Sequence, residues 1–436
     1  MRVARFNPFV CIELHVTPMD PVFTPESSNP LLGLHHQAGA EMQPYDRLEI
    51  VSTFGEPQAE YAAIRKGCAL LDEPYRGILE LTGKDRHAFL NNLLTNQTWD
   101  KTRKAGPVEG QGVYAFFLNL KGRIVADMNV LERGDRTYLE TDARLVEPLR
   151  EAFEKYRFAE QVTMTPRAGS LHRLTLHGPD APPLIQALSG SSVADLKPLG
   201  SVAVRLFDAE VTVFRDDMAG VPGLHLIVDT ARASDVWRGL LAPAGERPES
   251  WKRRVWPAGW AAFNATRIEG GRPLFGIDFE GAPVASAFPA RKQREEQPAE
   301  ASGGPGVLPA ETGQLHRAVS FTKGCYLGQE IVARMHARAQ VARQLVGFQV
   351  DDDSLPVAGA PVFDPASPQN PVGVVTSSTV SPVLSRRAIG FAFVKKPFTP
   401  AGSTVLVPAE GAVRRATVVA LPFVGGGSEA GDGGVK

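Results

Sequence analysis

The chain has 436 residues, enough for about three domains at ~150 residues each. Lysine and arginine total 47 against 48 for aspartate and glutamate, a net charge of −1, so no basic field exists to attract a nucleic-acid backbone directly. Three cysteines without a C-x-x-C pair argue against a disulfide framework or a metal ribbon, so we expect no resident metal and a cytoplasmic, reducing setting. No stretch approaches the ~18 apolar residues of a membrane span, and we expect no membrane partner.

The N-terminal half predicts an extension followed by two α+β domains. Residues 1–45 contain five prolines between Pro18 and Pro44 and few paired apolar positions, so we expect an N-terminal extension that carries no targeting signal, with a weak transit peptide as the alternative. The first domain, 46–160, has predicted helices at 56–66, 85–94 and 145–158 and predicted strands at 78–82, 113–118 and 123–130. The second domain, 161–280, has predicted strands at 171–176, 201–207, 211–214 and 224–228 and helices at 181–188 and 231–241. This order lacks the strand–helix alternation of a doubly wound nucleotide fold.

The C-terminal half predicts a flexible insertion, a short motif segment and a barrel. Residues 281–306 are charged and then glycine-rich, which is typical of a flexible surface insertion. A motif segment follows at 307–340. From 341 to 424 short period-two runs separated by Pro and Gly predict a small β-barrel, and 425–436 form a flexible tail.

One stretch, Val319–Arg334, does not have the composition of an ordinary helix or strand. It places Cys325 between two glycines and two residues after Lys323, and a predicted helix begins near Gly328. A nearby cation or the positive end of a helix stabilises a thiolate, so Cys325 is a candidate reactive thiol. The alternative is a buried, inert cysteine, which is the commoner fate of an isolated one.

The run Lys323-Gly324-Cys325-Tyr326-Leu327-Gly328-Gln329-Glu330, with Arg334, closely resembles the signature of the YgfZ family of folate-binding proteins. That family is related to the glycine-cleavage aminomethyltransferase and to a mitochondrial iron–sulfur assembly factor. Further matching segments are Gly83–Asp85 with Phe89–Asn96, Leu118–Ile124, Ala258–Trp260, Arg267–Gly276 and Leu308–Thr312. The resemblance covers about residues 46–423 and implies an aminomethyltransferase-like ring of three domains whose central channel binds tetrahydrofolate or a derivative.

Two positions depart from the transferase pattern. Where the transferase carries paired aspartates, this chain has Ala126-Asp127, and where the transferase has a Gly-Glu-x-Gly turn whose Glu holds the pteridine, this chain has Gly220-Val221-Pro222-Gly223. The Val221 side chain accepts no hydrogen bond. On these grounds we expect no aminomethyl transfer and a weaker or differently posed folate.

The resemblance also implies roles for individual residues. Tyr114, Arg267, Glu269 and Arg272 are the implied folate-binding residues, with the two arginines on the glutamyl carboxylate. Cys325, Lys323 and Asp127 are the implied catalytic residues. The remaining motif residues are Gly324, Tyr326, Gly328, Gln329, Glu330 and Arg334. Each has an ordinary alternative: Tyr114 as a core aromatic, the arginines as a helix end and a turn residue, Lys323 and Gln329 as shapers of the loop, and Glu330 at a helix N-terminus.

Three functions remain open on this evidence. The first is a folate-binding protein that supports the assembly or repair of iron–sulfur client enzymes and, through them, tRNA methylthiolation. The second is a folate-dependent aminomethyltransferase that uses Asp127 with Tyr114 and Arg267. The third is a non-catalytic interaction protein with a vestigial channel.

Overall fold

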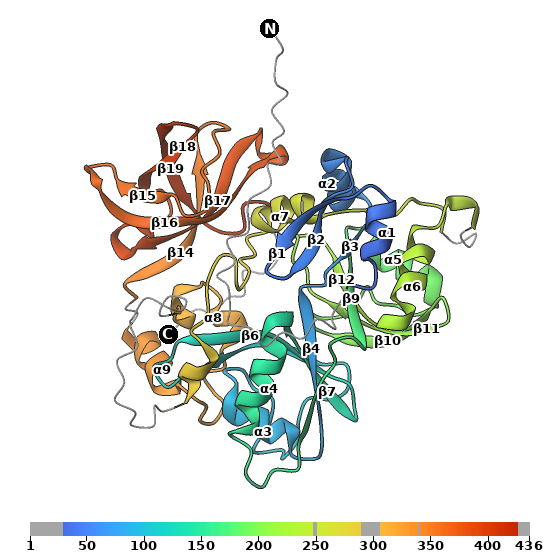
Figure 1. The fold of residues 1–436 in the computed structure, drawn as a ribbon. Helices are drawn as coiled ribbons and strands as arrows, with labels where there is room; N and C mark the ends of the chain where they lie inside the picture. The colour runs from blue at the N-terminus through green and yellow to red at the C-terminus, as the bar shows by residue number, and fades with distance from the viewer. Residues whose placement is uncertain (1–28, 247–250, 289–305, 339–340, 426–436) are drawn as a thin grey trace.

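The computed structural model describes residues 29–246, 251–288, 306–338 and 341–425. Three bodies meet at a common centre, with the barrel at the upper left of Figure 1, the β4–β7 sheet at the bottom and the β9–β12 sheet on the right. This confirms the predicted α+β architecture with a closed C-terminal barrel. The arrangement brings residues far apart in the chain to one central cavity.

The first sheet has the order β5-β6-β7-β4-β8 and is antiparallel throughout. Its strands are β4 (Arg76–Thr82), β5 (Gly112–Leu118), β6 (Ile124–Glu132), β7 (Arg136–Asp142) and β8 (Thr163–Pro166), and its helices are α3 (Arg86–Leu93), η1 (Ala143–Leu145) and α4 (Val146–Glu154). Apolar side chains of the strands, among them Leu79 and Phe117, pack against α3 and α4, and Phe153 of α4 belongs to the same core. The opposite face of the sheet turns toward the molecular centre.

The second sheet has the order β10-β11-β12-β9-β3-β13. Its elements are β3 (Ala69–Asp72), β9 (Leu171–His177), α5 (Ala181–Ser189), β10 (Ser201–Leu206), β11 (Ala209–Arg215), β12 (Gly223–Asp229), η2 (Thr230–Arg232), α6 (Ala233–Leu241), η3 (Ala244–Glu246) and β13 (Trp256–Pro257). Strand β3 pairs with β9, although it precedes all the strands of the first sheet in the chain. The chain therefore leaves the second body after β3, forms the first sheet, and returns to the second body at β9. Local sequence patterns do not indicate this path.

The central region contains α1 (Leu32–Gln37), β1 (Glu41–Tyr45), β2 (Leu48–Thr53), α2 (Pro57–Lys66) and α7 (Trp260–Glu269), with α2 packed on α7. Within the N-terminal extension predicted for residues 1–45, residues 29–45 form α1 and β1, while residues 1–28 lie outside the described part. Leu31 and His35 are fully buried, and His35 Nε2 lies 2.7 Å from Asp72 Oδ2. Long-range burial thus outweighs a proline-rich local composition.

The C-terminal domain is a closed barrel of order β14-β17-β16-β15-β18-β19. Its elements are β14 (Arg343–Val350), β15 (Pro361–Asp364), β16 (Ser367–Ser381), η6 (Pro382–Leu384), β17 (Arg387–Lys395), η7 (Lys396–Phe398), β18 (Thr404–Ala409) and β19 (Ala412–Val419). Inward-facing Val and Phe side chains fill it. The barrel predicted from period-two alternation is confirmed.

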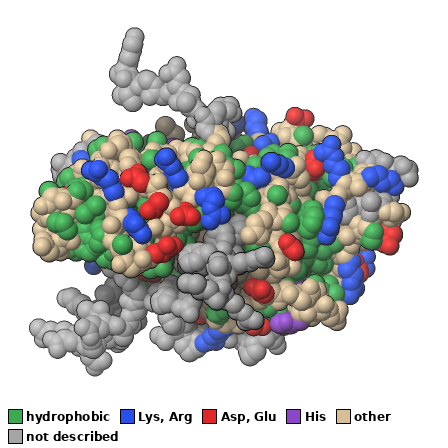
Figure 2. Space-filling model, turned by 90° about the horizontal axis from the view of Figure 1, so that it is seen from above, with side chains coloured by type: hydrophobic (Ala, Val, Ile, Leu, Met, Phe, Trp, Pro, Cys, Tyr) green, Lys and Arg blue, Asp and Glu red, His purple; other side chains and the backbone are tan. Residues whose placement is uncertain are grey.

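Short elements connect the second body to the barrel: η4 (Val284–Ala287), η5 (Pro309–Glu311), α8 (Leu315–Ala318) and α9 (Gln329–Arg338). Ala287 is fully buried, so the predicted surface insertion does not extend over 281–288, and 289–305 lie outside the described residues. Within the described ranges no helix has the length and apolarity that crossing a membrane requires. Figure 2 shows acidic and basic side chains interspersed over the upper face, in line with a net charge of −1.

Candidate functional site

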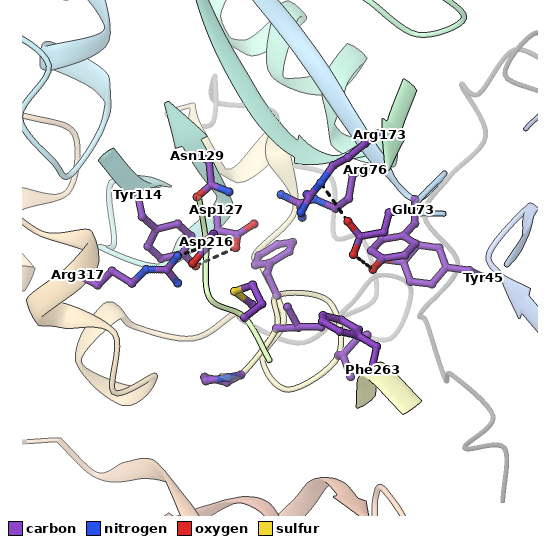
Figure 3. A pocket seen from close by; sticks show the side chains of 16 residues that line it. Tyr45, Glu73, Arg76, Tyr114, Asp127, Asn129, Arg173, Asp216, Phe263 and Arg317 are labelled. Carbon is purple, nitrogen blue, oxygen red and sulfur yellow. Dashed lines mark hydrogen bonds and ion pairs between the residues drawn. The ribbon is translucent and has the colours of Figure 1, made fainter. Parts of the chain in front are cut away.

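A cavity lies where the two sheets and the loop after α7 meet (Figure 3). Both sheets and the connecting segments contribute to its wall. Its lining residues are Tyr45, Glu73, Tyr75, Arg76, Tyr114, Asp127, Asn129, Arg173, Asp216, Met218, Phe263, Pro273, Leu274, Phe275, Ile277 and Arg317. Buried charged groups facing apolar walls in a concave site are the usual mark of a small-molecule site.

Asp127 and Tyr114 lie in this cavity because of the alternation along β5 and β6. Ala126 and Met128 point into the core under α3 and α4, so Asp127 and Asn129 point the other way. Tyr114 lies opposite Asn129 in the neighbouring strand, and its hydroxyl donates a 2.8 Å hydrogen bond to Asp127 Oδ2. The structure thus brings together two of the residues that the resemblance singled out.

Burial sets the acid–base character of this pair. It raises the pKa of Asp127, and the guanidinium of Arg76 and the Tyr114 hydrogen bond only partly oppose this effect. It also raises the pKa of Tyr114, with the Asp127 charge acting in the same direction. Asp127 Oδ1 has no partner among the described residues. A carboxyl of this kind is suited to exchange a proton with a ligand or to bind one of its N–H groups.

A second group of charged residues, Glu73, Arg76 and Arg173, lines another side of the cavity, and the two arginines pair with Glu140, which does not line it. Glu140 accepts hydrogen bonds from Arg76, Arg173 and the Asn129 amide, and Arg173 Nε lies 3.0 Å from Glu73 Oε2. Burial alone would raise the pKa of Glu140, but Arg173 and Arg76 hold it below its usual value. These carboxylates are therefore ionised and can only accept hydrogen bonds.

Arg317 lines a further part of the cavity wall. It lies on α8, within the motif segment 307–340, and its Nη2 donates a 2.6 Å hydrogen bond to Asp216 Oδ2. Its guanidinium carbon lies 4.3 Å from the Tyr114 ring centroid. Arg272, an implied folate ligand, does not line the cavity; its Nη2 is 4.0 Å from Asp216 Oδ1.

Arg267 and Glu269 do not line the cavity either. Both are fully buried on α7, where Arg267 Nη1 donates a 2.6 Å hydrogen bond to Asp278. Glu269 accepts from Tyr61 at 2.9 Å and from Ser381 in the barrel. Because α7 sits between the α+β bodies and the barrel, these two side chains hold domains together in this structure, and the implied contact with folate stays a prediction.

The signature residues of the motif, Lys323–Glu330 with Arg334, do not line the cavity. Cys325 is exposed, which argues against the alternative of a buried, inert thiol. Lys323 is buried, and its Nζ donates to the backbone carbonyls of Asn91, Leu94 and Asn96. Burial and the ammonium of Lys101 lower the pKa of Lys323 to about 7.

Lys323 therefore anchors the loop that carries Cys325 to the backbone of residues 91–96. Within the described residues no hydrogen bond joins Lys323 to the Cys325 thiol. A different cation lies against the loop, because a Cβ atom at Gly324 would be 2.6 Å from Lys101 Nζ. The sequence offered no signal for Lys101, which precedes the motif by more than 200 residues.

Two glycines hold the motif loop on the β5–β6 hairpin. Gly328 has φ +76°, and a Cβ there would lie 2.6 Å from the Asn119 carbonyl oxygen. Gly122 in the hairpin likewise has no space for a side chain, since Ile331 of α9 packs on it. Tyr326 is buried, Gln329 is half-buried, and Glu330 and Arg334 are exposed on α9. The helix begins at Gln329, as predicted, so its N-terminus lies close to Cys325 in the chain.

The cavity contains residues that sequence reasoning missed. Arg76, Asn129, Arg173, Asp216 and Arg317 were not singled out. A charged or amide residue inside an apolar strand, as for Arg173 in β9 and Asn129 in β6, was the available signal. Within the described residues no group of three or more His, Cys, Asp and Glu side chains is placed to hold a metal ion.

The GCVT N-terminal domain family matches residues 31–284, and the glycine cleavage T-protein C-terminal barrel domain family matches residues 343–425. The chain belongs to the glycine cleavage T-protein family. The finer assignment to the YgfZ branch stays a prediction.

Relatives of this T-protein family member cover nearly its whole length. The aminomethyltransferase of Moorella thermoacetica is 27% identical over 395 residues, which are 90% of this chain and 96% of that protein. The aminomethyltransferase of Chloroherpeton thalassium is 24% identical over 399 residues, 91% and 98% of the two chains. The crystal structure of glycine cleavage system aminomethyltransferase T from Bartonella henselae matches with a TM-score of 0.74 at 21% identity, over 91% and 97% of the chains, which supports the fold.

The structure weakens the two sequence arguments against transfer in this T-protein family member. Position 126 faces the core, so an aspartate there would not enter the cavity, whereas Asp127 does. Val221 packs against the cluster around α2 and α7 and is not among the cavity residues. The cavity therefore keeps its buried carboxyl despite both departures.

Proposed function

We propose that this chain binds tetrahydrofolate or a derivative in the central cavity and supports the assembly or repair of iron–sulfur client enzymes, and through them tRNA methylthiolation. The observation that carries this proposal is the exposed Cys325, four residues before the start of α9 and outside the cavity. A loop that only filled space would bury its cysteine. An exposed thiol in a loop that precedes a helix, with the Lys101 ammonium against the neighbouring Gly324, is available to a partner protein.

The cavity suits a folate in two respects. Its apolar walls, among them Phe263 and Phe275, accept a flat heterocycle, and its buried polar groups orient one. A folate also carries carboxylates, for which guanidinium is the matching group. Three arginines, Arg76, Arg173 and Arg317, line the cavity and are each also paired with a carboxylate of the protein, whereas Arg267 does not line it.

The test pairs two cysteine variants. Purified wild type, Cys325→Ala and the control Cys68→Ala, whose cysteine is buried, are titrated with tetrahydrofolate and then expressed in cells lacking the protein. We expect all three to bind folate, and only Cys325→Ala to fail in restoring iron–sulfur enzyme activity and tRNA thiomethylation. Full restoration by Cys325→Ala would refute the role of the thiol.

Aminomethyl transfer is a second candidate, and the names of the relatives support it more directly than the first. Asp127 supplies the observation: a buried carboxyl in the cavity, with a raised pKa and one free oxygen. In this case Asp127→Asn would abolish transfer of an aminomethyl carbon to tetrahydrofolate, and Cys325→Ala would retain it. Absence of any folate binding by the wild type would instead favour a non-catalytic interaction protein.

A further inference from the structure

Two buried oxygen atoms in the cavity lack a hydrogen-bond donor. They are Asp127 Oδ1 and Asn129 Oδ1, on side chains that are 7% and 6% exposed, and neither has a partner among the described residues. Buried polar atoms of native proteins are almost always hydrogen-bonded. Both residues line the cavity, so the missing donors are expected from whatever occupies it.

The orientation of the Asn129 amide follows from its neighbour. Asn129 Nδ2 donates a 2.8 Å hydrogen bond to Glu140 Oε2. Glu140 also accepts from Arg76 and Arg173, and these cations keep it ionised and unable to donate. The nitrogen end of the amide must therefore face Glu140, and the oxygen end is left free.

Asp127 is oriented in a similar way. The Tyr114 hydroxyl donates to Oδ2 at 2.8 Å, which leaves Oδ1 as the free acceptor. Asp127 and Asn129 are two residues apart on β6, so their side chains stand on the same face, ~7 Å apart at the backbone. The strand thus presents two fixed acceptors side by side, as Figure 3 shows for the two labelled side chains.

The rest of the wall limits the ligand class. Apolar side chains line the cavity together with these polar groups: Met218, Phe263, Pro273, Leu274, Phe275 and Ile277. Two acceptors on one strand, with apolar surfaces nearby, match a flat ring that carries N–H donors along one edge and has apolar faces.

We propose that Asn129 is a specificity-determining residue, and that Asn129 Oδ1 and Asp127 Oδ1 bind the N–H edge of an aminopyrimidine-type heterocycle such as the pterin ring of a folate. The exocyclic amino group is assigned to Asn129 and a ring N–H to Asp127. This inference rests on the proposed folate binding and adds the residues that recognise the ring.

The experiment compares two ligands by calorimetry: tetrahydrofolate and an analogue in which a methyl group replaces the exocyclic amino group. The wild type is expected to bind the analogue at least tenfold more weakly. Asn129→Leu is expected to weaken tetrahydrofolate binding by at least tenfold and to change binding of the analogue by less than twofold. The control Met128→Leu, on the core side of β6, should leave both affinities unchanged.

The outcomes separate this inference from the proposed function. If the wild type binds both ligands equally tightly, the inference is overturned and the proposed folate binding stands. This outcome does not depend on the folding of any variant. Equal weakening of both ligands by Asn129→Leu also overturns it, because a structural role does not discriminate between ligands. Absence of binding of tetrahydrofolate by the wild type overturns both.

Discussion

The guanidinium carbon of Arg317 lies 4.3 Å from the ring centroid of Tyr114, and the hydroxyl of that ring donates to Asp127. Arg317 is also bound to Asp216 at 2.6 Å. Arg317, which belongs to the motif segment 307–340, thereby helps to fix the position of the Tyr114 ring and, through it, of the Asp127 carboxyl. The cavity and the motif segment are therefore linked by these Arg317 contacts, although Cys325 lies outside the cavity.

Removal of the Arg317 side chain is expected to lower the free energy of unfolding. Arg317→Ala leaves Asp216 buried without its 2.6 Å partner, and breaking a buried ion pair costs about 3 kcal/mol. The matched control is Arg205→Ala, whose pair with Asp208 is exposed on both sides and should contribute less than ~1 kcal/mol. Urea unfolding measures both, and equal losses in the two variants would contradict the assignment.

Asp127 makes stability depend on pH with a definite sign. Its folded pKa is raised, so burial disfavours the charged form in the native state relative to the unfolded chain, and this penalty is absent at low pH. As pH rises past the ordinary value of 3.8, the unfolded chain ionises more readily and the native state loses stability. We expect Asp127→Asn to have a higher melting temperature than wild type at pH 7, with the difference shrinking toward pH 4. A constant difference across this range would count against a buried, titrating carboxyl.

Gly328 is expected to be required for the motif loop. Gly328→Ala combines a φ of +76° with a Cβ 2.6 Å from a backbone oxygen, whereas Gly402→Ala has a φ of +90° and nothing within 4 Å. Both variants carry backbone strain, but only the first also displaces the hairpin, so we expect it to lose about 2 kcal/mol more stability. Equal unfolding free energies would show that the loop moves freely.

Cys325 and Cys68 should differ in accessibility. Cys325 is exposed and Cys68 is fully buried in the core of the second sheet. Iodoacetamide should label Cys325 in the native protein and Cys68 only after unfolding, as judged by peptide mass spectrometry. The Cys325→Ala variant identifies the labelled peptide, and labelling of Cys68 at the same rate under native conditions would show that the core opens.

Local sequence determined the barrel, because alternating apolar residues along 345–394 specify which face of each strand is buried. It also determined helices such as α2 and α5, whose apolar spacing and first-turn prolines act within one turn. The motif at 323–330 showed an unusual loop, since two glycines beside a cysteine have no role in a regular strand or helix.

Only the tertiary structure decided which charged residues share a cavity. Arg76, Arg173 and Arg317 come from three separate segments, and their common partners depend on how the two sheets and α8 meet. The same holds for Arg267, which the family resemblance placed near a ligand, and for Lys323, which local sequence placed near a thiol; they bind Asp278 and backbone carbonyls. A side chain's charge is local, whereas the partner that satisfies it once buried is set by packing between distant segments.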